Sequence, residues 1–347
     1  MKILSIETSC DETSVAIVED GRKILTDQIY TQIAIHRKYG GVVPEIASRN
    51  HVIKLPYVIQ DALDDTGLTL EAVDAIAVTR GPGLVGALLV GVSEAKALAY
   101  ALGKPLIGVN HIEGHIAANY LAFPTLTPPF LALVVSGGHT NLVLVENYES
   151  NIILGQTRDD AAGEAFDKVA RVLGYPYPGG PAIDRAAEMG DPDFVDFPCV
   201  FLEKDTFDFS FSGLKSAVLN YLNHCKMKNI AYKPEDIAAS FQASVVEVLV
   251  KKTIDCARST GMNKICVAGG VSANRGLRDA LKQACQENGW ELYYPPLALC
   301  TDNAAMIGAR AYYDFKAGRL SGWDLNAEPG LELPAQFARR PDRKSVV

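Results

Sequence analysis

The chain has 347 residues, 48% of them apolar and 21% charged, with a formal net charge of −8. This composition is ordinary for a globular enzyme of two domains or two lobes, and its acidity excludes nonspecific nucleic-acid binding through the whole surface. A nucleic-acid substrate would therefore need a local basic patch or a partner subunit. The seven scattered cysteines form no CxxC pair and indicate a reducing, cytoplasmic compartment, and the apolar stretches are too short for a signal peptide or a membrane span.

Two segments share one plan, in which an apolar run is followed by a polar turn and a second apolar run. Residues 3–20 and 131–147 both fit it, and short β-branched runs around a tight polar loop predict β-hairpins. The segments are about 128 residues apart, which suits a duplicated lobe and is too long for a solenoid repeat. We therefore expect two lobes whose hairpin loops face a shared cleft, with chance similarity of two hairpins as the alternative.

The rest of the chain alternates between strands and helices, which predicts α/β layers rather than a bundle or a sandwich. Strands are expected at residues 75–79, 105–109, 264–268 and 291–294, and helices at 87–101, 159–173, 237–260 and 304–316. The expected domains are an N-terminal lobe at 1–123, a C-terminal lobe at 130–303, a helical segment at 304–335 that packs back on the first lobe, and a tail at 336–347.

A histidine pair follows the strand expected at 105–109. His111 and His115 are four residues apart, so on a helix both imidazoles lie on one face and can share a divalent transition metal. In a zinc protease the residue after the first histidine is a glutamate that acts as general base, but here it is Ile112, and Glu113 faces away. A pair of partly exposed histidines without a metal is the alternative that spacing alone leaves open.

A third metal ligand has to come from another part of the chain. Asp302 is the candidate, in the turn before the helix expected at 304–316. Two histidines and one carboxylate with open coordination positions suit Fe²⁺ or Zn²⁺. The alternative for Asp302 is a helix N-cap, a common role for aspartate.

Three glycine-bearing loops predict a nucleotide site. They lie at residues 136–140, 177–181 and 268–274, and two of them directly follow expected strands. Consecutive backbone N–H groups in such loops form concavities that bind anions. The chain has no Walker or Rossmann glycine motif, which disfavours a P-loop kinase or a nicotinamide enzyme. Ordinary turns are the alternative for each loop taken alone.

Polar side chains near these loops are candidates for catalysis and binding. Asp11 and Glu12 lie in the first hairpin loop, where they would repel a bare phosphate but could orient a water, a metal or an amine. His139 in the second hairpin loop could act as a base or bind a phosphate. Asp167 could accept hydrogen bonds from ligand hydroxyls, or pair with Arg171 one helical turn away.

With these residues in view, the chain resembles the bacterial TsaD family, formerly described as glycoproteases. Its members transfer a threonylcarbamoyl group from threonylcarbamoyl-AMP to the N6 amine of the adenosine 3′ to the anticodon, in tRNAs that read codons beginning with adenine. The resemblance rests on nine segments in the same order, at residues 7–13, 39–45, 81–88, 111–115, 136–140, 161–168, 209–215, 268–274 and 300–303.

The resemblance implies an actin-like, sugar-kinase and Hsp70-like ATPase (ASKHA) fold, with two duplicated α/β lobes around a central cleft. It implies one divalent metal, Fe²⁺ before Zn²⁺, held by His111, His115 and Asp302. ATP, ADP or the adenylate would bind in the cleft, at Val134, Val135, Ser136, Gly137, Gly138, Asp167, Gly180, Asp184 and Asn274.

The resemblance also implies partners and a reaction. Besides tRNA, these are TsaB, bound through the N-terminal lobe, the ATPase TsaE, and TsaC as the source of the adenylate. Metal-assisted acyl transfer would release AMP, with Asp11, Glu12 or His139 handling protons. The alternatives are a metal-dependent glycoprotease, a small-molecule kinase or carbamoyltransferase on the same fold, and an ATP-gated scaffold of a multiprotein complex.

Overall fold

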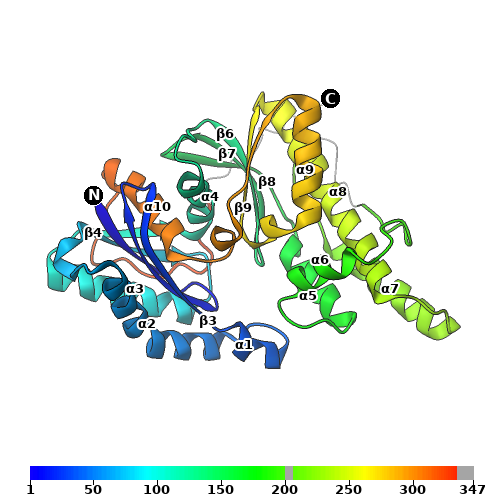
Figure 1. Cartoon of the computed structure of the whole chain (residues 1–347), viewed down its shortest axis with the longest axis horizontal. Helices are drawn as coiled ribbons and strands as arrows, with labels where there is room; N and C mark the ends of the chain where they lie inside the picture. The colour runs from blue at the N-terminus through cyan, green and yellow to red at the C-terminus, as the bar shows by residue number, and fades with distance from the viewer. Residues whose placement is uncertain (200–205, 334–347) are drawn as a thin grey trace, which may run out of the picture.

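The computed structural model describes residues 1–199 and 206–333, so the tail predicted at 336–347 and the end of the segment predicted at 304–335 lie outside the described residues. Two five-stranded mixed sheets organise the described chain (Figure 1). The first has the strand order β3-β2-β1-β4-β5 and the second β10-β9-β6-β7-β8. The strands are β1 Lys2–Glu7, β2 Glu12–Glu19, β3 Lys23–Thr31, β4 Ala75–Gly81, β5 Leu106–Asn110, β6 Phe130–Val135, β7 Thr140–Asn147, β8 Ser150–Gln156, β9 Lys264–Ala268 and β10 Glu291–Tyr293.

The two sheets are built in the same way. β1 and β2 pair antiparallel, as do β6 and β7, and these are the two predicted hairpins. In each sheet a third strand extends the hairpin antiparallel, and two later strands add parallel on the other side of the first strand. This identical pairing confirms the predicted duplication and rejects chance similarity of two hairpins.

Helices form three layers around the two sheets. α2 and α3 cover the outer face of the first sheet, and α5 to α9 cover the outer face of the second. α4 and α10 pack against each other between the sheets (Figure 1). The helices are α1 Ile33–His36, α2 Pro44–Thr66, α3 Val85–Leu102, α4 His111–Ala122, α5 Ala162–Val172, α6 Gly179–Ala187, α7 Ser212–Lys228, α8 Pro234–Thr260, α9 Arg275–Asn288 and α10 Ala304–Lys316.

The central strands are apolar along their whole length because helices cover both of their faces. Every residue of β6 is buried, and successive side chains alternate between the two faces. Val134 therefore packs in the core next to α4, and Val135 packs in the core beneath the outer helices. The residues after α10 return to the first sheet, where Ser321 N donates to Leu106 O at 2.8 Å.

Two predicted helix starts are wrong by three residues. The helix predicted from residue 237 begins at Pro234, as α8. The helix predicted from residue 159, with acidic residues in its first turn, begins at Ala162, as α5. Asp159 lies before the helix because its carboxylate accepts hydrogen bonds from Phe211 N at 2.9 Å and Ser212 N at 3.2 Å. This contact fixes the start of α7 against the loop that leads into α5.

The expectation that the apolar stretches are too short to span a membrane does not hold for α3. It has 18 residues and a mean hydropathy of 1.5, so by length and composition alone it could cross a membrane. In the structure one side of α3, including Leu88, Val92 and Ala95, is buried against α2 and β4. The helix therefore contributes to the core of the first lobe.

Candidate functional site

The histidine pair lies at the start of α4, directly after β5. Asn110 ends the strand and caps the helix, because its side-chain oxygen accepts a hydrogen bond from Ile112 N at 2.8 Å. His111 and His115 lie one turn apart, with ring centroids separated by 4.5 Å. They are 5% and 0% exposed, so the alternative of a partly exposed pair is wrong.

Asp302 joins the pair from the loop before α10. Its Oδ1 lies 3.4 Å from Nε2 of His111 and 3.2 Å from Nε2 of His115. The cap of α10 is the next residue, Asn303, whose side-chain oxygen accepts a hydrogen bond from Met306 N at 2.9 Å. Asp302 is therefore not the helix cap, and its carboxylate faces the histidines instead.

The geometry of these three residues fits a metal ion. One donor atom from each of His111, His115 and Asp302 lies within 4.8 Å of the others. Both ring nitrogens of His115 are buried and make no hydrogen bond within the described residues, although Nε2 is near the carboxylate. Unpartnered buried nitrogens are costly, and a cation would satisfy one of them. Two imidazoles and a carboxylate suit Fe²⁺ or Zn²⁺.

Carboxylates on two sides set the charge of His111. Burial lowers its pKa, but the charges of Asp302 and Glu7 outweigh burial and raise the pKa to about 10. Desolvation raises the pKa of Asp302, and the neighbouring His111 outweighs it and holds that pKa below the usual range. The cluster without an ion therefore keeps a proton on His111, which a divalent cation would displace.

Glu113 points away from the histidines, as its position on the helix predicted. Its Oε1 accepts a hydrogen bond from Asn151 Nδ2 at 2.6 Å and lies 3.2 Å from Arg310 Nη2. Ile112 packs in the core between α4 and the second sheet. Neither residue can serve as the general base of a zinc protease.

Two acidic side chains lie where the β1–β2 loop ends: Asp11 is in the loop, whereas Glu12, which the sequence also placed in the loop, is the first residue of β2. Asp11 is 5% exposed, and its Oδ2 has no hydrogen-bond partner among residues 1–199 and 206–333. Glu12 accepts a hydrogen bond from Thr31 Oγ1 at 3.1 Å, and burial, followed by the charge of Asp11, raises its pKa well above the usual range. Two carboxyl groups side by side can exchange a proton with a ligand.

The glycine loops after β6 and β9 meet at the start of α5. A Cβ on Gly163 would lie 2.4 Å from Ser136 O, and one on Gly269 would lie 2.5 Å from Val135 O, so neither position admits a side chain. Other glycines of the three predicted loops face open space, because a Cβ added to any of them would have no other atom within 4 Å; these are Gly137, Gly138, Gly180 and Gly270.

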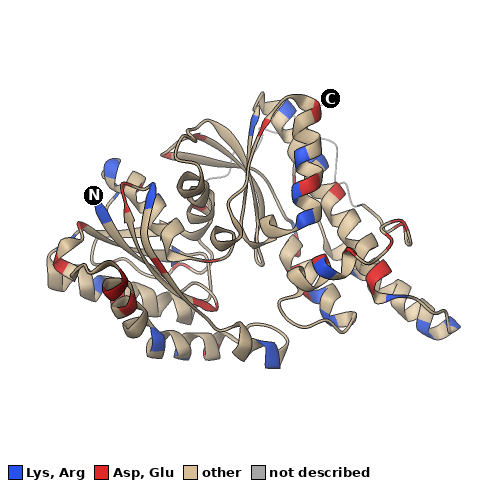
Figure 2. Ribbon diagram, viewed as in Figure 1, with Lys and Arg blue, Asp and Glu red and all other residues tan. Residues whose placement is uncertain are grey.

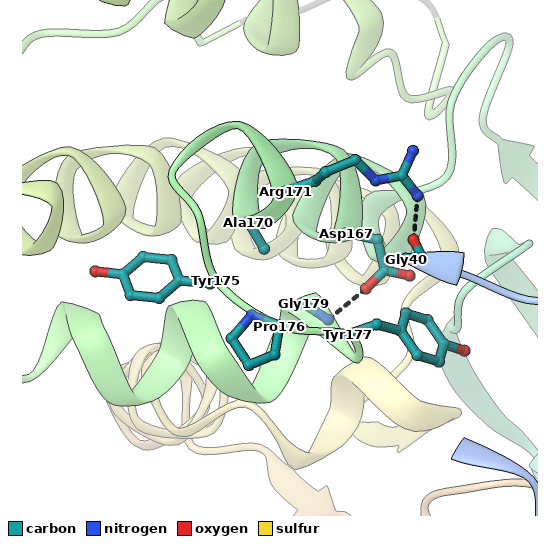
Figure 3. A pocket seen from close by; sticks show the side chains of 8 residues that line it. All are labelled: Gly40, Asp167, Ala170, Arg171, Tyr175, Pro176, Tyr177 and Gly179. Carbon is teal, nitrogen blue, oxygen red and sulfur yellow. Dashed lines mark hydrogen bonds between the residues drawn. The ribbon is translucent and has the colours of Figure 1, made fainter. Parts of the chain in front are cut away.

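The third loop is tied to α5 through Asp167. Its Oδ1 accepts a hydrogen bond from Gly179 N at 2.6 Å, at the start of α6 (Figure 3). Arg171 donates to Gly40 O of the first lobe, so it is engaged elsewhere and not with Asp167 (Figure 3). A small hollow opens here between the lobes; it is lined by Gly40, Asp167, Ala170, Arg171, Tyr175, Pro176, Tyr177 and Gly179.

His139 closes the loop after β6. Its N–H donates to Ser136 Oγ at 3.2 Å, and its carbonyl oxygen accepts from Ser136 N at 2.8 Å. Burial, followed by the charge of His111, lowers the pKa of His139 to about 4. The imidazole is therefore neutral at pH 7 and free to accept a proton or a hydrogen bond.

Other predicted binding positions already have partners within the protein. Val134 and Val135 are 0% exposed, so they offer a ligand only main-chain atoms. Asp184 accepts a hydrogen bond from Arg275 Nε at 3.0 Å. Asn274 caps α9 by accepting from Leu277 N at 2.9 Å, and these contacts fix the loops that face the cleft.

Sequence reasoning did not single out Glu7 as a site residue. It ends β1, is 0% exposed, and its Oε2 lies 3.0 Å from Nδ1 of His111, which is 104 residues away in the chain. The available signal was an acidic residue that ends an apolar strand directly before a polar loop. The sequence could not show its partner.

The TsaD family model, described as tRNA N6-adenosine threonylcarbamoyltransferase, matches residues 23–309. The chain belongs to this family. A relative with that name from Clostridium botulinum is 56% identical over 333 residues, which cover 96% of this chain and 98% of the relative. One from Moorella thermoacetica is 57% identical over 331 residues, 95% of this chain and 97% of the relative.

Solved structures share the fold of this TsaD-family chain. HypF of T. kodakarensis superposes with a TM-score of 0.62 at 15% identity, covering 93% of this chain and 49% of HypF. ROK hexokinase from Thermus thermophilus has a TM-score of 0.50 at 15% identity and covers 92% of this chain and 99% of the hexokinase. At this identity they show the fold alone, and they confirm the predicted ASKHA architecture.

Proposed function

We propose that this chain is an acyltransferase that moves the threonylcarbamoyl group from threonylcarbamoyl-AMP to the N6 amine of the adenosine 3′ to the anticodon in tRNA. Relatives named for this transfer align with it over nearly their whole length. In the structure, one observation carries the proposal: the cluster of the buried His111 and His115 with the partly buried Asp302, at the start of α4 and just before α10.

The cluster suits the acyl phosphate of this substrate. His111, His115 and Asp302 would hold Fe²⁺ or Zn²⁺, which when bound supplies Lewis-acid charge for phosphate and threonyl oxygens. α4 begins at His111, and α10 begins two residues after Asp302, so the N-termini of both helices meet here. The positive dipole ends of the two helices favour an anion at the same place.

The glycine loops would hold the AMP part of the substrate. Gly137, Gly138, Gly180 and Gly270 border open space, which lets main-chain N–H groups approach phosphate and ribose oxygens closely. Asp167, which fixes the third loop, would accept a hydrogen bond from a ribose hydroxyl.

Asp11 and Glu12, at the end of the β1–β2 loop and the start of β2, would take part in proton transfer. The amine nitrogen attacks the carbamoyl carbon, the bond from that carbon to the phosphate oxygen breaks, and AMP leaves. The nitrogen loses one proton, and we assign Asp11 as its acceptor because its buried Oδ2 has no hydrogen-bond partner within the described chain. Glu12 lies beside it, and neutral His139 is the second candidate base or phosphate ligand.

We propose that the chain works with partner subunits in the cytoplasm. Lys and Arg are interspersed with Asp and Glu along the helices, and the net charge is −8, so we propose that partner subunits help to bind tRNA (Figure 2). α2 and α3 pack side by side and carry exposed apolar side chains, which fit a TsaB subunit on the first lobe; these are Val52, Ile53, Tyr57, Val85 and Leu89. TsaE would act on this complex, and TsaC would supply the adenylate.

The decisive experiment follows transfer of radiolabelled threonine to unmodified tRNA by the purified chain with TsaB, TsaE and TsaC. We expect transfer by the wild-type chain and by His224→Ala, an exposed histidine on α7, and at least a hundredfold loss in His115→Ala. Retained transfer in a metal-free His115→Ala protein would overturn the assignment. Metal-dependent cleavage of a glycoprotein would favour the protease, and partner assembly without transfer would favour the scaffold.

A further inference from the structure

Glu7 is a fully buried carboxylate whose two oxygens are both engaged. Oε2 accepts a hydrogen bond from Thr79 Oγ1 at 2.6 Å and lies 3.0 Å from His111 Nδ1. Oε1 accepts a hydrogen bond from Ser9 N. The side chain is 0% exposed, so three donors from β4, α4 and the β1–β2 loop converge on one carboxylate.

Glu7 is the nearer and the only charged partner of His111 Nδ1 among the described residues, since Ser9 Oγ lies 3.3 Å from the same nitrogen, and this contact bears on which nitrogen can bind a metal. A neutral imidazole carries one N–H and one lone pair, and a carboxylate beside Nδ1 holds the proton there. The lone pair is then on Nε2, the atom that faces Asp302 at 3.4 Å. His115 differs, because both of its ring nitrogens lack hydrogen-bond partners in the described residues.

We propose that Glu7 is a positioning residue for the metal site: it fixes the tautomer and ring orientation of His111 so that Nε2 is presented to the ion. Carboxylate–histidine–metal arrangements of this kind raise the basicity of the ligand and strengthen metal binding. The proposal rests on the metal site proposed above, and it goes further in assigning this role to a residue outside the ligand set.

Glu7 also connects the metal helix to the loop that carries Asp11. Ser9, which donates to Glu7, lies two residues before Asp11, and its carbonyl oxygen accepts from Leu84 N at 2.8 Å. A Cβ on Gly83 would lie 2.7 Å from that oxygen, so the main chain of the loop is held tightly. The contact of Glu7 with Ser9 N therefore keeps His111 and Asp11 in a fixed relation.

The substitution Glu7→Gln tests the tautomer directly. Ser9 N is a backbone donor and requires an acceptor, so the amide oxygen of Gln would face Ser9 and the NH₂ group would face His111. That NH₂ donates to Nδ1, which moves the imidazole proton to Nε2 and removes the lone pair from the metal side. Glu7→Asp keeps the charge but withdraws the carboxylate by one methylene group.

The measurement is Co²⁺ binding to the full chain, by equilibrium dialysis and by the visible absorption bands of bound Co²⁺. We expect Glu7→Gln and Glu7→Asp to bind about 10- to 100-fold more weakly, with altered bands, and the exposed control Glu287→Gln to bind as wild type. Circular dichroism and the Tm of the metal-free proteins show whether each variant folds. If Glu7→Gln does not fold, Co²⁺ binding by Glu7→Asp alone tests the proposal.

The outcomes separate the role of Glu7 from the metal site itself. If His115→Ala abolishes Co²⁺ binding while both Glu7 variants bind within about twofold of wild type with unchanged bands, the positioning role is wrong. If His115→Ala also binds Co²⁺ as wild type does, the metal site is wrong and the proposed function loses its central support. If Glu7→Gln weakens binding in the wild type but has no further effect in His111→Ala, Glu7 acts through His111.

Discussion

Replacing Arg310 on α10 tests which contacts hold α4 and α10 together between the sheets. Its side chain is buried, with 3% of the residue exposed. Nη2 lies 3.2 Å from Glu113 Oε1 on α4 and 2.9 Å from Asp314 Oδ1 on α10, and Nη1 donates to Tyr148 O at 2.5 Å. One guanidinium therefore joins both helices to the turn between β7 and β8.

Arg310→Ala leaves two carboxylates with fewer partners in a buried place. Removing one member of a buried ion pair typically costs about 3–5 kcal/mol, because the remaining charge is left uncompensated. Glu113 keeps Asn151 and Asp314 keeps Arg319, but Tyr148 O loses its donor at a further cost of about 1–3 kcal/mol. Since the retained contacts offset part of this, we expect unfolding free energy to fall by about 3–5 kcal/mol.

The matched control is Arg319→Ala, which removes a second arginine from the same Asp314. The Arg319 side chain is 40% exposed, so its loss should cost about 1 kcal/mol or less. Urea unfolding can be followed in each lobe separately. Trp290 packs on the core of the second lobe, and Trp323 contacts Tyr100 on α3, so single-tryptophan versions report on each.

We expect Arg310→Ala to shift both tryptophan transitions, because the network lies between the sheets. A double-mutant cycle with Glu113→Gln should show coupling of about 1–3 kcal/mol between the two side chains. If Arg310→Ala costs no more than Arg319→Ala, or if only one lobe responds, the buried pair does not link the two halves and this account is refuted.

Three further predictions concern other parts of the chain. Burial raises the pKa of Asp27 from its ordinary 3.8 to about 6, so stability falls as pH rises through that window. Urea denaturation should therefore give Asp27→Asn an unfolding free energy up to about 3 kcal/mol above that of wild type at pH 7 but not at pH 4. The exposed control Asp61→Asn should have the unfolding free energy of wild type at both pH values. Asn303→Ala removes the cap of α10 and should lower the unfolding free energy by about 1 kcal/mol, whereas Asn303→Ser keeps a capping oxygen and should retain most of that stability. Equal Tm values for the two variants would contradict the capping role. Tyr57→Glu, at a position 67% exposed on α2, should weaken TsaB binding at least tenfold in calorimetry without changing Tm, and unchanged affinity would exclude this face.

The fold was largely predictable because its signals are local. The apolar runs around short polar loops at residues 3–20 and 131–147 indicated two hairpins, and the sheets contain both with the same pairing. The spacing of His111 and His115 placed both on one helix face, which the structure shows. Neither signal depends on contacts between distant residues.

What the sequence left open depended on such contacts. Asp302 and Asn303 are adjacent, and both are good caps by type, so only the path of the chain decides that Asn303 caps α10. Asp159 looked like part of a helix until its partner, Phe211 N, 52 residues away, was known. Glu7 was missed for the same reason, since its role depends on His111.

The contact between α4 and α10 has a consequence for ion binding. α4 follows β5 of the first sheet directly and also lies against β6 and β9 of the second, whereas Asp302 precedes α10, which packs on α4 and on the first sheet. An ion held by His111, His115 and Asp302 would therefore join the start of α4 to the loop before α10. By reciprocity, any substrate or partner that moves α4 away from α10 would weaken ion binding, and loading the ion would oppose that separation by the same free energy.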